Sequence, residues 1–239
     1  MLESLLPHQR LFTYKVAHDA GSAPNPYDCI CTLALCKPAI RRVAQPGDLI
    51  VGLGCGDDDA RIVYAMVVAH SVSWPVYISA CSYGEPKLDD VEPRALRRRI
   101  PSSASDPGDC IWRDGAKFVK AFDSLSLHGG PEDFQHDVTN GANVLIGRRF
   151  WYFGRGDSHV VRLPSGLRSI IPGRGHRSNS NKEFRNAFVS FFNSTLVNED
   201  IVAPGKYGEP KDAPAIPDQA AAARCRATQR EFDSYGEDE

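Results

Sequence analysis

The strongest constraint on the fold is a pair of apolar segments joined by an acidic turn. Asp48–Leu53 and Arg61–Val72 are dense in Ile, Val, Leu and Tyr, and Gly54–Ala60 between them is rich in Gly and Asp. Runs of β-branched and aromatic residues bounded by Gly, Pro and Asp are typical of strands. The stretch therefore predicts a buried β-hairpin, preceded by a short basic helix over Ala34–Val43.

The other predicted elements show no regular alternation of strands and helices. The expected strands are Leu11–Ala17, a hairpin over Cys110–Val119 that turns at Asp114-Gly115, Asn143–Ile146 and Phe150–Phe153. The expected helices are Trp74–Cys81 and Asn181–Leu196, the second with a Ser180/Glu183 capping box and an apolar face of Phe184, Phe188, Phe191, Phe192 and Leu196. This order predicts an α+β fold with a mixed, largely antiparallel sheet flanked by a few helices.

One folded domain is expected. Residues 1–10 are interpreted as an N-terminal extension, and residues 11–198 as a single α+β domain with a charged, Pro-rich connector at about 82–107. Residues 199–239 are acidic and rich in Pro and Ala, so they are expected to form a disordered tail.

The formal net charge of −2 is unevenly distributed along the chain. Residues 199–239 hold ten acids and five bases, a net charge of −5, whereas the rest of the chain carries +3. A mildly basic body is compatible with nucleic-acid contact but does not require it. No apolar run approaches the ~18 residues of a membrane span, and the first residues do not resemble a secretory signal. A cytoplasmic protein with reduced cysteines and no membrane partner is therefore expected.

Four residues of one short segment are the best catalytic candidates. His128, Glu132, His136 and Asp137 combine imidazoles and carboxylates, which together can perform acid–base catalysis or bind a metal. On a helix, however, Glu132 and His136 are four residues apart and can simply pair on the surface. Surface pairing is the favoured interpretation.

Three cysteines lie close together, at Cys29, Cys31 and Cys36. No second pair completes the four ligands of a zinc site, so buried thiols are favoured, and neither a metal nor a cofactor is expected. Cys36 is an alternative nucleophile, because Lys37 and a helix start would lower its pKa. The sequence places no base beside it.

The segment Gly173–Arg177 (GRGHR) precedes the predicted helix at Asn181. Free N–H groups at a helix start, two glycines, and Arg174 with Arg177 would suit a phosphate. An unoccupied basic loop is an equally weighted alternative. By contrast, the glycines of GLGCG at Gly52–Gly56 lack the spacing and the following helix of a dinucleotide site, and they are expected to belong to the hairpin.

Aromatic residues could form a stacking wall for a base, although a core position is more common for each of them. They are Tyr14, Trp74, Trp112, Trp151 and Tyr152. The run Arg97–Arg99 is expected to be solvated, with contact to a nucleic-acid backbone as the minor alternative.

Several segments, taken in order, resemble a known family. They are TYKVAHDAGSAPNPY, CTLALCKPAIRRVAQPGDLIVGLG, RIVYAMVV, GDCIW, NVLIGRRFWYFG and GRGH. Over about Leu11 to Phe192 the chain resembles the nucleotide modification associated domain family, type two. The resemblance implies a bacterial or phage protein linked to systems that make or handle modified DNA bases. A looser likeness of the Gly-Asp turn and the RIVYAMVV strand to PUA, ASCH, EVE and YTH modules implies a pseudo-barrel as the alternative fold.

The resemblance implies a nucleotide-binding site. Lys37, Arg41 and His176 are expected to meet phosphate or base acceptors, and Asn25 or Asp109 to contact a base edge. Together with the residues singled out above, the expected nucleotide-binding set is Asp19, Asn25, Lys37, Arg41, Asp109, Trp112, Tyr152, Arg174, His176 and Arg177.

The leading functional hypothesis is a binding module for a modified nucleotide or for a modified base in DNA. One alternative is a hydrolase or transferase that acts on such a nucleotide with His128, His136, Asp137 and Cys36. The other is a protein-interaction domain with protein partners in a base-modification complex.

Overall fold

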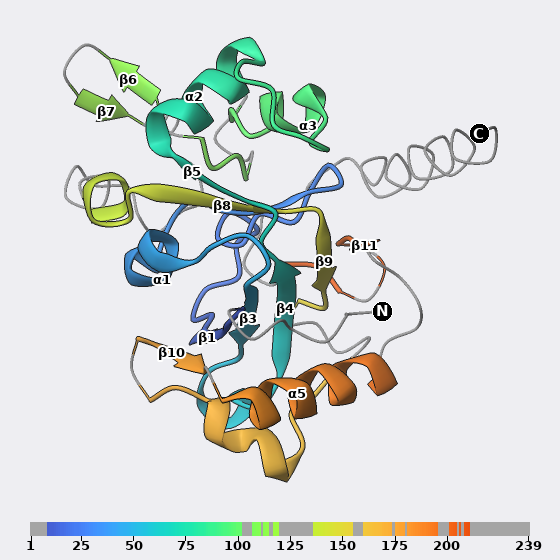
Figure 1. The fold of residues 1–239 in the computed structure, drawn as a ribbon. Helices are drawn as coiled ribbons and strands as arrows, with labels where there is room; N and C mark the ends of the chain where they lie inside the picture. The colour runs from blue at the N-terminus through green and yellow to red at the C-terminus, as the bar shows by residue number, and fades with distance from the viewer. Residues whose placement is uncertain are drawn as a thin grey trace.

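The computed structural model describes residues 9–101, 107–110, 112–114, 117–119, 136–154, 160–173, 175–179, 181–195, 201–204, 206 and 208–210. Within these ranges the chain forms a large sheet, a smaller sheet, a short separate hairpin and a few helices (Figure 1).

The large sheet has six strands in the order β10-β1-β3-β4-β9-β11. Their bounds are β1 Leu11–Lys15, β3 Leu49–Leu53, β4 Ile62–Val67, β9 Arg149–Tyr152, β10 His176–Asn179 and β11 Ile201–Val202. The pairs β1·β3 and β9·β11 are parallel and the others are antiparallel. The predicted hairpin is confirmed as β3 and β4, which are joined by a 3₁₀ turn, η1, at Gly56–Asp58.

The small sheet is antiparallel, with the order β2-β8-β5. Its strands are β2 Cys31–Leu33, β8 Asn143–Gly147 and β5 His70–Ser73. The returning strand predicted over Arg61–Val72 is therefore two strands, β4 and β5, in different sheets. The chain also changes sheets between β8 and β9, where a Cβ on Gly147 would lie 2.7 Å from the Val67 carbonyl oxygen.

The helices are α1 Pro38–Val43, α2 Trp74–Tyr83, α3 Pro93–Arg97 and α5 Lys182–Thr195, with a π-helical turn η2 at His136–Asn140 and a 3₁₀ turn η3 at Ser165–Ile170. The hairpin predicted over Cys110–Val119 is confirmed as β6 Trp112–Asp114 and β7 Lys117–Val119, whereas Gly115 of its predicted turn lies outside the described residues. No helix in the described ranges is both long and apolar enough to cross a membrane.

The elements stack in layers (Figure 1). Helix α5 packs Phe188 and Phe192 against Trp151 on one face of the large sheet. The small sheet covers the other face, where Leu145 lies among Phe12 and Ile50. Helices α2 and α3 pack on the outer face of the small sheet.

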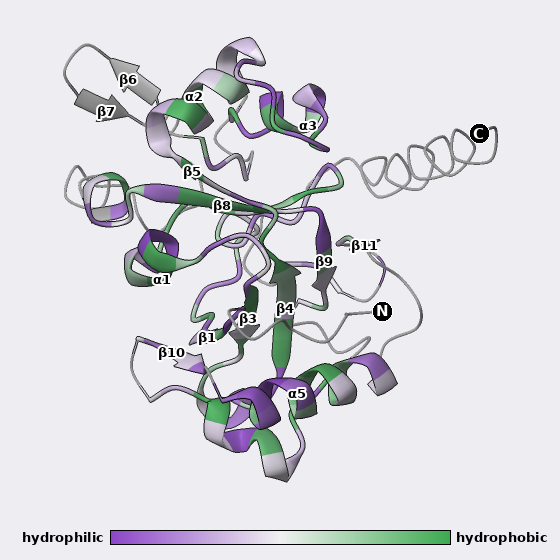
Figure 2. Cartoon of the chain, viewed as in Figure 1, coloured by the Kyte–Doolittle hydropathy of each residue, from purple (hydrophilic) through white to green (hydrophobic). Residues whose placement is uncertain are grey.

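Figure 2 shows hydrophobic residues along the whole of β4, whereas they alternate with hydrophilic ones along α5. The predicted α+β fold with a mixed sheet is confirmed, and the described strands close no barrel.

Two helix starts differ from the prediction. The Asn181 side-chain oxygen accepts the N–H groups of Glu183 at 2.9 Å and Phe184 at 3.2 Å, so Asn181 caps α5. Ser180 and Leu196 lie outside the described residues. Helix α1 begins only at Pro38, because Cys36 and Lys37 adopt positive φ angles of 59° and 46°.

The connector and the predicted tail both contribute to the folded body. Arg99 was expected in a solvated run, but it is buried, and its guanidinium donates to the carbonyl oxygens of Tyr27 at 2.5 Å and Ile30 at 3.0 Å. These buried loop carbonyls need donors, and the arginine supplies them. Strand β11 and residues 208–210 extend the described fold beyond residue 198.

Candidate functional site

A row of five residues crosses the large sheet. His176, Tyr14, Gly52, Tyr64 and Tyr152 lie directly opposite one another on β10, β1, β3, β4 and β9. Directly paired residues project to the same face of a sheet. This set, called the tyrosine row below, therefore faces the small sheet.

Gly52 makes room within the tyrosine row. A Cβ at this position would lie 2.5 Å from Cδ1 of the Tyr64 ring and 2.7 Å from Cγ2 of Val16. The Tyr64 ring occupies the space above the glycine, and its hydroxyl meets that of Tyr14 at 2.8 Å. The missing side chain thus permits a buried hydrogen bond between two tyrosines on strands that are not adjacent.

Asp19 lies at the far end of the tyrosine row. The Tyr152 hydroxyl donates to its carboxylate at 2.6 Å, and both side chains are buried. Burial raises the pKa of Tyr14, Tyr64 and Tyr152 well above the ordinary value for a phenol. These hydroxyls therefore stay neutral and can act as hydrogen-bond donors. Two residues of the predicted site, Asp19 and Tyr152, are in direct contact.

Lys37 and His176 lie at the opposite end. The Lys37 ammonium is 5.0 Å from the centre of the Tyr14 ring, within the range of a cation–π contact. Burial, and then the charge of Lys37, lower the pKa of His176. The imidazole is therefore neutral at pH 7 and has one donor and one acceptor. A half-buried cation beside a neutral imidazole can bind an oxyanion such as a phosphate.

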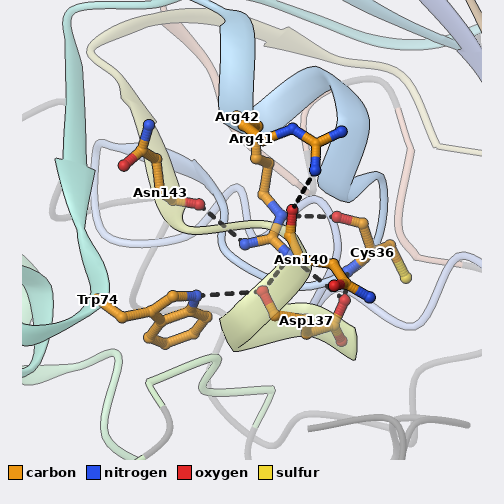
Figure 3. A network of polar contacts seen from close by, with 7 residues as sticks. All are labelled: Cys36, Arg41, Arg42, Trp74, Asp137, Asn140 and Asn143. Atoms are coloured by element: carbon orange, nitrogen blue, oxygen red, sulfur yellow. Dashed lines mark hydrogen bonds and ion pairs between the residues drawn. The ribbon is translucent and has the colours of Figure 1, made fainter. Parts of the chain in front are cut away.

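A buried arginine holds the turn that presents Lys37 (Figure 3). The Arg41 side chain is fully buried and donates to the carbonyl oxygens of Cys36 at 2.7 Å, Asn143 at 2.8 Å and Asp137 at 2.6 Å. Its guanidinium also lies 3.3 Å from the Asp137 carboxylate. Burial lowers the pKa of Arg41 to about 10, while Asp137 acts in the opposite direction. The guanidinium therefore remains charged at neutral pH.

Asp137 completes this network from the π-helical turn η2. Its carboxylate accepts the Cys36 N–H at 2.8 Å, and its carbonyl oxygen accepts the Trp74 indole N–H at 3.3 Å (Figure 3). Two successive non-glycine residues with positive φ are strained, and such strain persists only where neighbouring contacts enforce it. Arg41 and Asp137 supply those contacts, so we interpret them as positioning residues for Lys37.

Asn25 and Asp109 form a separate buried cluster. Asp109 accepts hydrogen bonds from the hydroxyls of Thr32 and, at 2.7 Å, Tyr77. The Asn25 amide donates to the Pro107 carbonyl at 2.9 Å and accepts from Arg99. Burial raises the pKa of Asp109. The polar atoms that were expected to contact a base edge are thus bonded within the fold.

The predicted phosphate loop is only partly described. Arg177 is exposed and donates to the Ser169 carbonyl, whereas Arg174 lies outside the described residues. The Asn181 side chain already occupies two N–H groups at the start of α5. The helix start therefore has fewer free donors for a phosphate than predicted.

The predicted stacking wall is not formed in this conformation. Tyr14, Trp74, Trp151 and Tyr152 are each at most 1% exposed, so their ring faces are covered by protein. The Trp112 side chain lies outside the described residues. His128 and Glu132 are also outside them, and of His136 only the backbone, at the start of η2, is described.

Neither Tyr64 nor Gly52 was among the predicted site residues. The local hairpin pattern placed them on neighbouring strands without giving their register, and nothing local indicates that β1, β9 and β10 place Tyr14, Tyr152 and His176 in the same row. In the described ranges, no group of three or more His, Cys, Asp and Glu residues gathers to form a possible metal site. Cys31, Cys36, Cys55, Cys81 and Cys110 are free thiols, but Cys29 is disulfide-bonded, contrary to the expectation of reduced cysteines.

Comparison with known proteins gives a family match. A family model described as nucleotide modification associated domain 2 matches residues 8–214, which include both ends of the tyrosine row and the Arg41 network. Comparisons with curated proteins and with solved structures gave no significant match.

Proposed function

The chain belongs to the nucleotide modification associated domain 2 family, and on that premise we propose that it binds a modified nucleotide, or a modified base in DNA. The family description supports a role in nucleotide modification. One observation supports a binding role for the site: a buried arginine network holds Lys37 in a strained turn, above Tyr14 and beside His176.

The proposed phosphate contact is at Lys37 and His176. Because the turn is fixed, the backbone of Lys37 loses no conformational freedom on binding, so more of the attraction between the lysine and an anion appears as affinity. The exposed Arg177 follows His176 on β10 but projects to the opposite face of the sheet, where it donates to the Ser169 carbonyl, so it lies outside this contact. If the ligand is a base in duplex DNA, that base must leave the stack, at a cost of a few kcal/mol.

The hypothesis of a hydrolase or transferase with His128, His136 and Asp137 has less support. The Asp137 carboxylate is buried and accepts the Cys36 N–H beside the Arg41 guanidinium. Those contacts suit a structural role better than proton transfer to a substrate.

The proposal predicts that Lys37→Ala weakens binding of a short single-stranded oligonucleotide that carries the modified base. A charged hydrogen bond contributes about 1.5–3 kcal/mol, so we expect a loss of about 10- to 100-fold in affinity. Fluorescence anisotropy at several salt concentrations should also show the logarithmic salt slope falling by about 0.7, as for the loss of one phosphate contact.

The matched control is Lys87→Ala, because Lys87 is exposed and lies far along the chain in the segment before α3. We expect its affinity and salt slope to equal those of the wild type. Equal oligonucleotide affinities of Lys37→Ala and Lys87→Ala would show that Lys37 does not contact the ligand. Circular dichroism of Lys37→Ala separates a loss of binding from a loss of folding.

A further inference from the structure

A short segment near the C-terminus lies across the Asp19 end of the tyrosine row. Gly208–Pro210 contacts Gly154, which follows Tyr152 by two residues, and Gly21, which follows Asp19 by two. Pro210 is buried, with its Cγ 3.1 Å from where a Cβ on Gly21 would lie. The segment therefore spans the two parts of the chain that form the Tyr152–Asp19 hydrogen bond.

Two glycines, Gly154 and Gly208, allow this segment to pack closely on the rest of the protein. A Cβ on Gly154 would lie 2.5 Å from the Glu209 carbonyl oxygen, and a Cβ on Gly208 would lie 3.0 Å from the Phe153 carbonyl carbon and nearer still to its oxygen. Real Cβ atoms do not approach other atoms so closely. Backbone therefore packs directly on backbone at both crossings, which requires the absence of a side chain.

Packing, and no hydrogen bond of the three described residues, positions this segment. In the part of the chain that the structure describes, no hydrogen bond joins Gly208, Glu209 or Pro210 to the body. Glu209 is partly buried, which raises its pKa, and its charge acts on the same two hydroxyls, Tyr27 and Tyr152, as the charge of Asp19. The part of the Glu209 carboxylate that is covered makes its charged form less favourable in this closed position. Close packing thus positions the segment without fixing it.

We propose that Gly208–Pro210 is a releasable strap, which closes the Asp19–Tyr152 end of the tyrosine row and opens to admit the hydrogen-bond-donating edge of a base. This inference rests on the proposed function. The buried Asp19 carboxylate accepts hydrogen bonds, so it suits an amino or imino N–H group of a base, while Lys37 and His176 suit phosphate. The strap would thus control access to a base-recognition subsite that is separate from the phosphate contact.

Gly208→Ala tests the strap, because the added methyl group collides with Phe153 and favours the open form. Hydrogen exchange, measured by mass spectrometry without any ligand, should become about fivefold or more faster over Asp19–Gly21 and at Gly154, but not in β3 or β4. With the modified oligonucleotide, the association rate constant should rise by a similar factor. Gly166→Ala is the matched control, because nothing lies within 4 Å of that position.

Glu209→Gln should act in the opposite direction, because it removes a charge whose partial burial disfavours the closed position. Exchange over Asp19–Gly21 should slow in this variant. Unchanged exchange in both variants would overturn the strap, whether or not any nucleotide binds. Faster exchange in Gly208→Ala with an unchanged association rate would overturn its role in admitting a ligand. A wild type that binds no nucleotide contradicts the proposed function instead, and the exchange data still report on strap opening.

Discussion

Replacing Arg41 by methionine is expected to lower the free energy of unfolding by about 3–5 kcal/mol, the cost of removing one partner from a buried ion pair. Methionine fills much of the same volume but donates no hydrogen bond. The Asp137 carboxylate would lose its cation, and the Cys36 and Asn143 carbonyls would lose their donor. Urea unfolding followed by circular dichroism measures this loss.

The neighbouring residue provides the control. Arg42 is exposed and donates one long hydrogen bond of 3.3 Å, to the Asn140 carbonyl. Arg42→Met should therefore cost less than about 1 kcal/mol, as expected of an exposed polar contact. If Arg41→Met cost no more than Arg42→Met, the Arg41 network would not hold the Lys37 turn. A double-mutant cycle with Asp137→Asn would show how much of the effect belongs to the pair.

Gly52→Ala is expected to destabilise the protein by about 1–3 kcal/mol, the usual cost of overpacking a core. The new methyl group would overlap the Tyr64 ring and push it away from the Tyr14 hydroxyl. Without such an overlap, replacing a strand glycine by alanine stabilises a protein by about 0.5–1 kcal/mol. A loss of stability would therefore indicate that Gly52 makes room for the Tyr64 ring, and a gain would indicate an ordinary strand glycine. Thermal or urea unfolding gives the answer.

A double variant makes this test specific to the tyrosine row. Replacing Tyr64 by valine removes the ring that the methyl group would meet, so Gly52→Ala should cost less in that background, where only the contact with Val16 Cγ2 at 2.7 Å remains. Gly166→Ala should be nearly neutral, since no atom lies within 4 Å there. Equal costs of Gly52→Ala with and without the Tyr64 ring would mean that the collision does not occur.

The sequence allowed the local elements to be predicted. The β3·β4 hairpin follows from two apolar runs around an acidic turn, and α5 follows from phenylalanines at helical spacing. Both patterns depend on residues close in sequence. The same is true of the small hairpin at β6 and β7. Hydrophobic periodicity indicates such elements, because a strand and a helix each place apolar residues at a regular spacing along the one face that is buried.

Long-range features could not be predicted in this way. The run Arg61–Val72 is apolar from Ile62 to Ala69, so no local signal marks the point where the chain leaves the large sheet after Val67. Arg99 is the last of three consecutive arginines, and only the fold shows that buried loop carbonyls receive its N–H groups. The tyrosine row likewise requires the register of five strands.

Only part of the site could be predicted, because long-range contacts bring its residues together. Family resemblance indicated Lys37, His176, Asp19 and Tyr152, and the structure brings them together in two pairs at opposite ends of the tyrosine row. It also indicated Arg41, for which the structure favours a positioning role. A list of residues does not distinguish a side chain that contacts a ligand from one that holds the contacting side chain in place.

The central claim is that this protein binds a modified nucleotide through Lys37. Its most direct test is native mass spectrometry of the purified protein after incubation with nucleotides digested from DNA of differing base modification. We expect the wild type and Lys87→Ala to retain one modified nucleotide and release it unchanged, and Lys37→Ala to retain none. Retention of no nucleotide by the wild type, or release of a chemically altered one, would contradict the claim.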